Sequence, residues 1–229
     1  MENLRFDIVG REGETIGDIA YRRIRSDVVN GKLKPLEKLK LDHLRKVYSA
    51  SVTTLREILN KLVVEELVTA EGQRGFRVAP IDEADLRGLA DLRILLECHA
   101  LRRSMANGDL EWEARVVSAH YKLSVIEKEL IAGNNGRVSQ WVQHDWGFHH
   151  ATIAASDGLP LMRTHSSVFD RYARYHMLAL DFRGKPVAED HERLRDLVLA
   201  RDADAAEALL VRHIQSGVEH ILGTGRIPG

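Results

Sequence analysis

Two side chains that commonly bind metals, Asp145 and His149, stand four positions apart in the second half of the chain. Side chains four residues apart on an α-helix project from the same face. A carboxylate oxygen and an imidazole nitrogen on one face form half of a site for Zn²⁺ or a similar divalent ion. An exposed Asp–His pair without any ligand has the same spacing, so these two residues alone leave both interpretations open.

Histidine is concentrated in the same part of the chain. Only His43 precedes Pro80, and the other ten of the eleven histidines follow it. His191 falls in the first turn of one expected helix and His213 inside the next, and antiparallel helices joined by a short turn can bring two such rings together. The single cysteine, Cys98, excludes an internal disulfide and any zinc site built on several thiolates. A metal ion would therefore be held by imidazoles and carboxylates.

A second group of residues has the chemistry of DNA recognition. Thr and Arg side chains in the first turns of a recognition helix bind base edges or phosphates, and basic residues of the preceding helix neutralise phosphates. A glycine beside an arginine in a wing allows close approach to the minor groove. Each such residue alone is also an ordinary solvated surface residue, and their order along the chain is what favours DNA binding. The residues predicted to contact DNA are Lys40, Arg45, Lys46, Thr53, Thr54, Arg56, Arg74 and Gly75.

The elements that would position these DNA contacts follow from the apolar pattern. Apolar residues recur at helical spacing in three stretches, the third of which has a good N-cap in Ser51, and two short strand-like runs follow. Three helices and then a β-hairpin are the arrangement of a winged helix-turn-helix. We expect this domain at residues 15–80, after a flexible arm at 1–14. Its expected elements are helices at 15–30, 39–47 and 51–62, and strands at 67–70 and 76–79 joined by a loop at 71–75.

Beyond Pro80 the strand signals vanish, and long amphipathic stretches alternate with short breaks rich in Gly, Asn and Pro. Short breaks between long helices predict an antiparallel bundle. Residues 81–229 are therefore expected to form an all-α domain, which makes the fold class of the whole chain mainly α. The expected helices are at 82–106, 110–132, 137–155, 160–181, 187–200 and 203–221.

The composition, with 29% charged and 44% apolar residues, is typical of a soluble globular protein. No apolar stretch approaches the roughly 20 residues that span a membrane, and the N-terminus lacks the apolar core of a signal peptide. We therefore expect a cytoplasmic location and no membrane partner. Residues 1–80 contain 15 Lys and Arg against 12 Asp and Glu, while residues 81–229 contain 18 against 22. This mild asymmetry favours DNA binding by the first domain only weakly.

Three runs in the first domain match a known family. The run from Gly31 reads Gly-x-Leu-x-Pro, the run from Ser51 reads Ser-x-Thr-x-x-Arg-Glu, and an Arg-Gly pair at 74–75 opens the second strand. In these features residues 15–80 resemble the N-terminal domain of the GntR family of bacterial regulators. The resemblance implies a winged helix-turn-helix that binds operator DNA.

The same resemblance implies that Thr53 and Arg56 contact DNA. Val52 stands where the family usually has a DNA-contacting Arg, and Ser49-Ala50 replaces the family's Gly-Val. The base readout at Val52 is therefore expected to differ from that of the family's common operator.

The second domain carries three further runs. They read Asp-x-x-Phe-His from Asp145, Glu-Asp-His from Glu189 and Leu-x-x-x-His-Ile from Leu209. In these runs residues 82–221 resemble the FCD ligand-binding domain of the FadR subgroup of GntR regulators. In that subgroup an Asp and three His hold a divalent metal, with Zn²⁺ as the first expectation and Ni²⁺, Mn²⁺ or Fe²⁺ as alternatives. The ligands that the resemblance implies are Asp145, His149, His191 and His213.

Arg93 matches an arginine that reaches the effector in this family. A guanidinium beside a metal ion suits a carboxylate ligand. The alternative is an ion pair within the helix between Arg93 and Glu97, which stand four positions apart. The stretch 109–114, together with 51–57, resembles the CsiR-type branch, whose members control dicarboxylate or amino-acid catabolism. A short dicarboxylate is therefore the first effector to test.

The sequence thus predicts a transcription repressor that binds double-stranded operator DNA as a homodimer, at a short inverted repeat. A small carboxylate effector beside a divalent metal would control its affinity for the operator. One alternative is a regulator for which the metal ion itself is the signal. A metal-dependent hydrolase is the other, but no additional Asp or Glu stands at motif spacing as a general base, so we expect no enzyme.

Overall fold

The computed structural model describes residues 13–179 and 181–228. The expected arm at 1–14 lies almost wholly outside these residues. The chain divides into two compact units, Met1–Ile81 and Asp82–Gly229.

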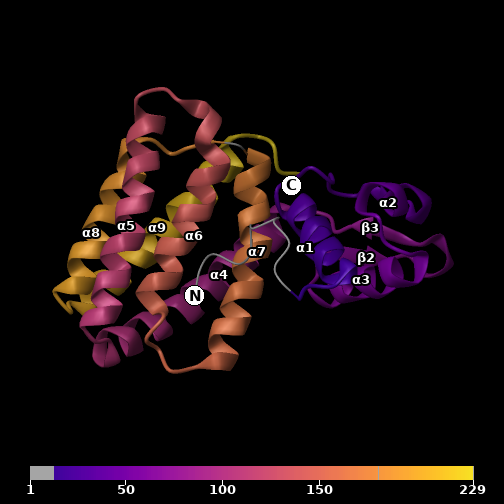
Figure 1. Cartoon of the computed structure of the whole chain (residues 1–229). Helices are drawn as coiled ribbons and strands as arrows, with labels where there is room; N and C mark the ends of the chain where they lie inside the picture. The colour runs from indigo at the N-terminus through magenta and orange to yellow at the C-terminus, as the bar shows by residue number, and fades with distance from the viewer. Residues whose placement is uncertain (1–12, 180, 229) are drawn as a thin grey trace. The chain divides into compact units, whose positions relative to one another are not determined.

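The first unit contains three helices, α1 (Ile16–Val29), α2 (Leu41–Tyr48) and α3 (Val52–Val64) (Figure 1). Helix α1 begins with a capping box in which the side chains of Thr15 and Asp18 each bind the other's backbone N–H. Helix α3 begins at the predicted N-cap, because the Ser51 hydroxyl accepts a hydrogen bond from the Thr54 N–H. The buried face of α3 packs against α1 and α2 and comprises Leu55, Ile58, Leu59 and Leu62.

The wing is a three-stranded antiparallel sheet rather than the two-stranded hairpin that the sequence predicts. Strands β2 (Val68–Ala70) and β3 (Phe76–Val78) form the hairpin, with a 3₁₀ turn at Gly72–Arg74, and β1 (Lys38–Leu39) pairs with the free edge of β3. Leu39, predicted to begin the second helix, instead lies in β1 opposite Phe76 and is buried. A strand of two residues is too short to show a period-two pattern, so the sequence does not distinguish its apolar residue from the first turn of the helix that follows.

The second unit consists of six long helices, and each end lies within two residues of the prediction. They are α4 (Glu83–Asn107), α5 (Leu110–Ile131), α6 (Val138–Ile153), α7 (Leu159–Ala179), α8 (Lys185–Leu199) and α9 (Ala203–Gly223). Aspartates accept hydrogen bonds from backbone N–H groups at three of the N-termini, as N-caps usually do: Asp82, Asp109 and Asp202.

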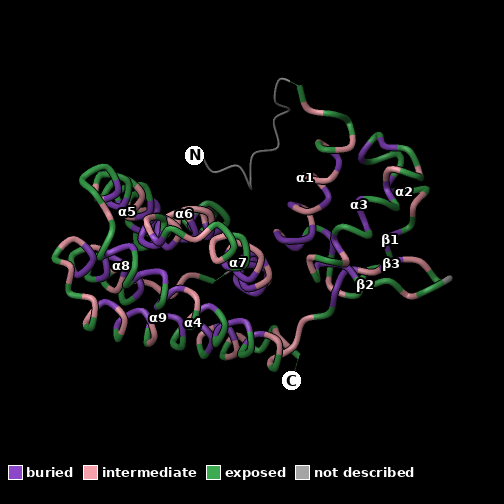
Figure 2. The backbone as a smooth tube through the Cα atoms, turned by 90° about the horizontal axis from the view of Figure 1, so that it is seen from below, coloured by how far each residue is buried: buried purple, intermediate pink, exposed green. Residues whose placement is uncertain are grey.

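The six helices form two layers. Figure 2 shows α5, α6 and α7 side by side in one layer and α8, α9 and α4 in the other, and the contacts between helices agree. Helix α6 is the middle of the first layer and α9 the middle of the second. Residues on their inner faces therefore meet at the centre of the bundle, which is where the predicted ligands lie.

Candidate metal centre and DNA-binding face

Three imidazoles and one carboxylate meet between the two helical layers. Asp145 and His149 come from α6, His191 from α8 and His213 from α9. One potential ligand atom from each lies within 4.8 Å of all the others. The residues are 8%, 0%, 0% and 5% exposed, respectively. The structure thus brings together the four residues that the sequence predicts as ligands.

Local structure explains this convergence. Asp145 and His149 occupy successive turns of α6, so both project from one face. Helices α8 and α9 are joined by a short turn and pack against each other, which leaves the His191 and His213 ring centroids 4.7 Å apart.

The Nε2 atoms of His149 and His191 face the Asp145 carboxylate. Asp145 Oδ1 lies 3.1 Å from Nε2 of His191 and 3.9 Å from Nε2 of His149. Both nitrogens are buried, and neither has an aligned hydrogen-bond partner among the residues that the structure describes. A buried polar atom without a partner is costly, and binding an ion is one way to satisfy several of them at once. The donor set of three imidazoles and a carboxylate therefore fits a divalent ion such as Zn²⁺.

Each of the three imidazoles turns its other nitrogen, Nδ1, toward a carboxylate. Such a carboxylate holds the proton on Nδ1, orients the ring and leaves the Nε2 lone pair available to a metal. The carboxylates come from α4, α5 and α8. His191 Nδ1 is hydrogen-bonded to Glu127 at 2.6 Å, and His213 Nδ1 to Asp190 at 3.3 Å. His149 Nδ1 lies 3.2 Å from Glu97 but lacks the alignment of a hydrogen bond.

The charges of this cluster are strongly coupled. Although burial opposes protonation, the carboxylates of Asp145 and Glu127 raise the pKa of His191 to about 9. The pKa of Asp145 is lowered despite burial, because His191 and His149 stabilise the carboxylate. Burial, together with the positive charges of His191 and Arg183, holds the pKa of His213 well below its usual value. In the ion-free protein one ring therefore holds an extra proton while another stays neutral.

Arg93 lies beside this cluster in the ion pair that the sequence allowed as an alternative. Its Nε and Nη2 atoms are 2.7 and 3.2 Å from the two oxygens of Glu97, and both side chains are almost fully buried. The guanidinium lies 4.5 Å from the ring centroids of both Phe169 and Tyr172. His165 also contacts Glu97, at 2.9 Å. Although burial opposes ionisation, Arg93 and the two nearby histidines hold the pKa of Glu97 well below its usual value. An effector contact by Arg93 stays a prediction.

Sequence reasoning missed most of this surrounding layer. Glu127 and His165 carried no signal beyond ordinary helix positions, and Asp190 was noted only as part of the Glu-Asp-His run. The spacing of Glu97 predicts only a partner for Arg93. One signal was available: these residues lie on helices that the sequence did predict, at positions that must be inside a six-helix bundle.

The first unit presents most of its predicted DNA contacts on the surface. Thr53 is exposed, whereas Thr54 is half-buried, with its hydroxyl 2.9 Å from the hydroxyl of Ser51. Gly75 has φ of +97°, a backbone conformation that favours glycine. Five basic side chains are exposed and form no ion pair within the described part of the chain, so they can contact phosphates. They are Lys40, Arg45, Lys46, Arg56 and Arg74.

Among the described residues, no helix is long and apolar enough to cross a membrane.

Comparisons with known proteins agree with this two-part arrangement. The profile for bacterial regulatory proteins of the gntR family matches residues 17–78, and the FCD domain profile matches residues 88–216. The HTH-type transcriptional regulator BphR of Paraburkholderia xenovorans (strain LB400) is 40% identical over 203 residues, which cover 88% of this chain and 83% of that protein. The HTH-type transcriptional repressor GlaR of Escherichia coli (strain K12) is 32% identical over 200 residues, covering 85% of this chain and 90% of that protein.

Two solved structures share the fold. A GntR transcriptional regulator from Rhodococcus sp. RHA1 superposes with a TM-score of 0.74 at 22% identity and covers 90% of this chain and 97% of that one. Escherichia coli McbR/YncC superposes with a TM-score of 0.76 at 19% identity and covers 92% and 98%, respectively. These relatives and neighbours are regulators rather than enzymes.

Proposed function

The chain is a DNA-binding transcriptional regulator that belongs to the GntR family, with an FCD domain, and we propose that it is a metal-dependent repressor that responds to a small carboxylate. In this proposal Asp145, His149, His191 and His213 hold a divalent ion, with Zn²⁺ the first choice. The effector binds beside the ion and changes the affinity of the winged helix for operator DNA.

One observation carries the metal assignment. The Nε2 atoms of His149 and His191 face Asp145, and all three imidazoles turn Nδ1 toward separate carboxylates. A structural histidine in a protein core has no need of this arrangement, whereas a metal-binding histidine usually has it. When bound, the ion would supply a positive charge and an open coordination position that attract a carboxylate. The residues of the chain orient the rings and exclude water.

Repression and dimer formation are inferred from the relatives and from the physics of operator binding. GlaR is named a repressor. A two-fold homodimer would place two copies of α3 in successive major grooves of a short inverted repeat, which a single winged helix cannot achieve. Effector binding would act by stabilising one arrangement of the dimer over another.

The metal assignment is tested with ion-free protein titrated with zinc, using a competing chelator to measure affinity and thermal melting to measure stability. Zinc at about 100 times its Kd should stabilise the folded protein by about 2.7 kcal/mol. His191→Ala should abolish this stabilisation. His99→Ala, an exposed histidine on α4, is the matched control and should keep it. If the wild-type protein binds no divalent ion, the proposal is wrong.

The control of DNA binding is tested separately, by measuring operator affinity with and without zinc and then with short mono- and dicarboxylates. An effect of carboxylates that requires zinc supports the proposal. An effect of zinc alone would instead support the ion as the signal.

A further inference from the structure

Arg183 reaches the imidazole cluster from the short segment between α7 and α8. Its Nη2 atom lies 3.4 Å from Nε2 of His213, the nitrogen that would bind the ion. Its Nη1 atom donates hydrogen bonds to the backbone oxygen of His213, at 3.2 Å, and to the hydroxyl of Ser216, at 2.6 Å. The guanidinium therefore lies directly against the metal-facing side of the cluster.

Arg183 differs from Arg93 in its charge partners. Arg93 is neutralised by Glu97, whereas Arg183 forms no ion pair with any carboxylate in the described part of the chain. Its Nε atom is buried, and within the described residues it has no hydrogen-bond acceptor. Burial lowers the pKa of Arg183, as expected for a cation removed from water without a counter-ion in contact. An anion at this position would satisfy both the charge and the unused donor.

A glycine and a further donor lie beside the guanidinium. Gly217 is one turn beyond His213 on α9, and a Cβ atom there would lie 3.0 Å from the Tyr172 hydroxyl and 3.8 Å from Cζ of Arg183. The approach to the Tyr172 hydroxyl is tight, so a side chain at this position would crowd that group. Burial raises the pKa of Tyr172, so its hydroxyl keeps its proton and can donate a hydrogen bond.

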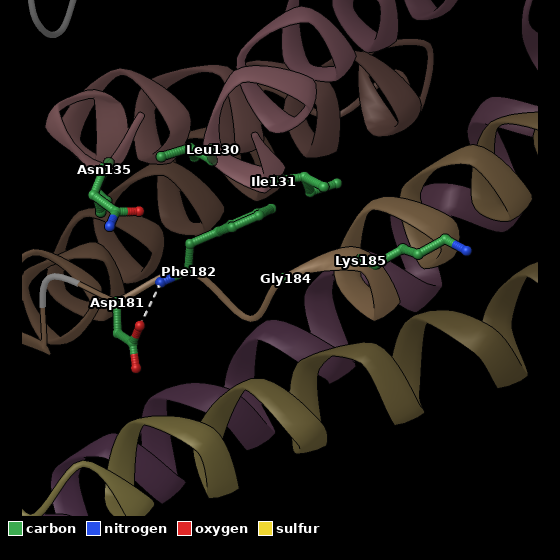
Figure 3. A pocket seen from close by; sticks show the side chains of 8 residues that line it. Leu130, Ile131, Asn135, Asp181, Phe182, Gly184 and Lys185 are labelled. Atoms are coloured by element: carbon green, nitrogen blue, oxygen red, sulfur yellow. Dashed lines mark hydrogen bonds between the residues drawn. The ribbon is translucent and has the colours of Figure 1, made fainter. Parts of the chain in front are cut away.

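The neighbours of Arg183 hold its segment in place from the other side. Phe182 packs edge-on against Trp141 of α6, with ring centroids 5.3 Å apart. Figure 3 shows Phe182 extending toward Leu130 and Ile131, in a pocket that is also lined by Asp181, Gly184 and Lys185. Arg183 does not line that pocket and instead contacts α9. The packing of Phe182 against α6 thus holds the segment that places Arg183 beside the cluster.

We propose that Arg183 binds the carboxylate of the effector, next to the ion and on the His213 side of the site. The proposal rests on the proposed function, because it requires a metal at the cluster. An ion on Nε2 of His213 would take the lone pair that now faces Arg183 and would place two cations side by side. A carboxylate between them removes this repulsion and matches the fork geometry of the guanidinium. Arg93 then keeps its structural pairing with Glu97.

The test uses full-length, zinc-loaded protein and acetate as the probe, titrated by calorimetry at constant ionic strength. Acetate carries the one chemical group that the proposal requires. Arg183→Gln should weaken acetate binding by about tenfold or more, the loss expected for a charge-assisted hydrogen bond. Arg183→Lys keeps the charge but not the fork and should give an intermediate affinity. Arg212→Gln, exposed and adjacent to His213, is the matched control and should bind acetate like the wild type.

Zinc affinity without acetate separates this proposal from the one on which it rests. Arg183→Gln should bind zinc at least as tightly as the wild type, because a cation beside the site is removed. If the wild type holds zinc but does not bind acetate, or binds it equally well after Arg183→Gln, the assignment of Arg183 is overturned. If the wild type does not hold zinc, the metal assignment itself fails, and the role of Arg183 fails with it.

Discussion

Two Arg–Glu pairs on helix α4 have the same spacing but opposite surroundings, and the replacement of each glutamate by glutamine should separate the effect of burial from that of sequence. In the Arg93–Glu97 pair the side chains are 3% and 1% exposed. In the Arg87–Glu83 pair they are 46% and 44% exposed. Glu97→Gln leaves Arg93 as a buried cation without a counter-charge, whereas Glu83→Gln leaves Arg87 in contact with water and with Glu219.

The expected magnitudes differ widely. Breaking a buried pair by removing one charge typically costs about 3–5 kcal/mol. For a unit of this size such a loss corresponds to a decrease in melting temperature of about 6–20 °C. Exposed ion pairs often contribute nothing measurable to stability, so the Glu83→Gln variant should have the same melting temperature as the wild type. Replacing both members, Arg93→Met with Glu97→Leu, should recover part of the loss, because the double variant no longer leaves Arg93 as an unpaired charge.

The chain offers a clean probe for this experiment. All three tryptophans, Trp112, Trp141 and Trp146, lie in the second unit, so intrinsic fluorescence reports unfolding of that unit alone. The measurement is made on ion-free protein, so that zinc binding does not contribute to stability. Equal, small shifts for Glu97→Gln and Glu83→Gln would refute the argument that Glu97 neutralises a buried arginine.

Three further predictions concern the ion, the DNA and the core of the first unit. In the ion-free protein His191 keeps its extra proton up to about pH 9, whereas the metal-bound ring must lose it, so zinc affinity should rise about tenfold per pH unit up to that value. Chelator titrations at several pH values that show no such rise would contradict this expectation. Arg56→Ala should weaken operator binding and reduce by about one the slope of log affinity against log salt concentration, measured by fluorescence anisotropy; an unchanged slope would show that Arg56 makes no phosphate contact. Leu55→Ala truncates a fully buried side chain of α3 and should destabilise the first unit by about 2–5 kcal/mol, as measured by circular dichroism. The unfolding midpoint of the second unit, measured by tryptophan fluorescence, should not change, and a shift in that midpoint would contradict independent unfolding of the two units.

How much could be predicted from the sequence depended on how local each feature is. The helices were predicted because their apolar residues repeat every three or four positions over several turns, and Ser51 was found because a cap acts on its own helix. Strand β1 was missed because its two residues are defined by pairing with β3, some 37 residues later in the register Leu39–Phe76.

The same distinction applies to the candidate site. Asp145 and His149 share a helix face, so their proximity was predictable from spacing. The carboxylate of Glu127 meets His191 only because α5 packs against α8, and no local pattern encodes that neighbour. The position of Arg183 beside the cluster could not be predicted for a further reason. Arg183 lies in an irregular segment, where no periodicity indicates the direction of a side chain.

The carboxylates around the three imidazoles also bear on which ions the bundle can accept. Asp145, Glu97, Glu127 and Asp190 bring four negative charges, and Arg93 and Arg183 bring two positive ones. Once the extra proton on His191 is lost, as metal binding requires, all three rings are neutral and these groups together carry two negative charges. A divalent ion supplies that difference in full, whereas a monovalent ion leaves half of it. The core therefore favours divalent over monovalent ions, and most of the charges responsible belong to residues that do not touch the ion.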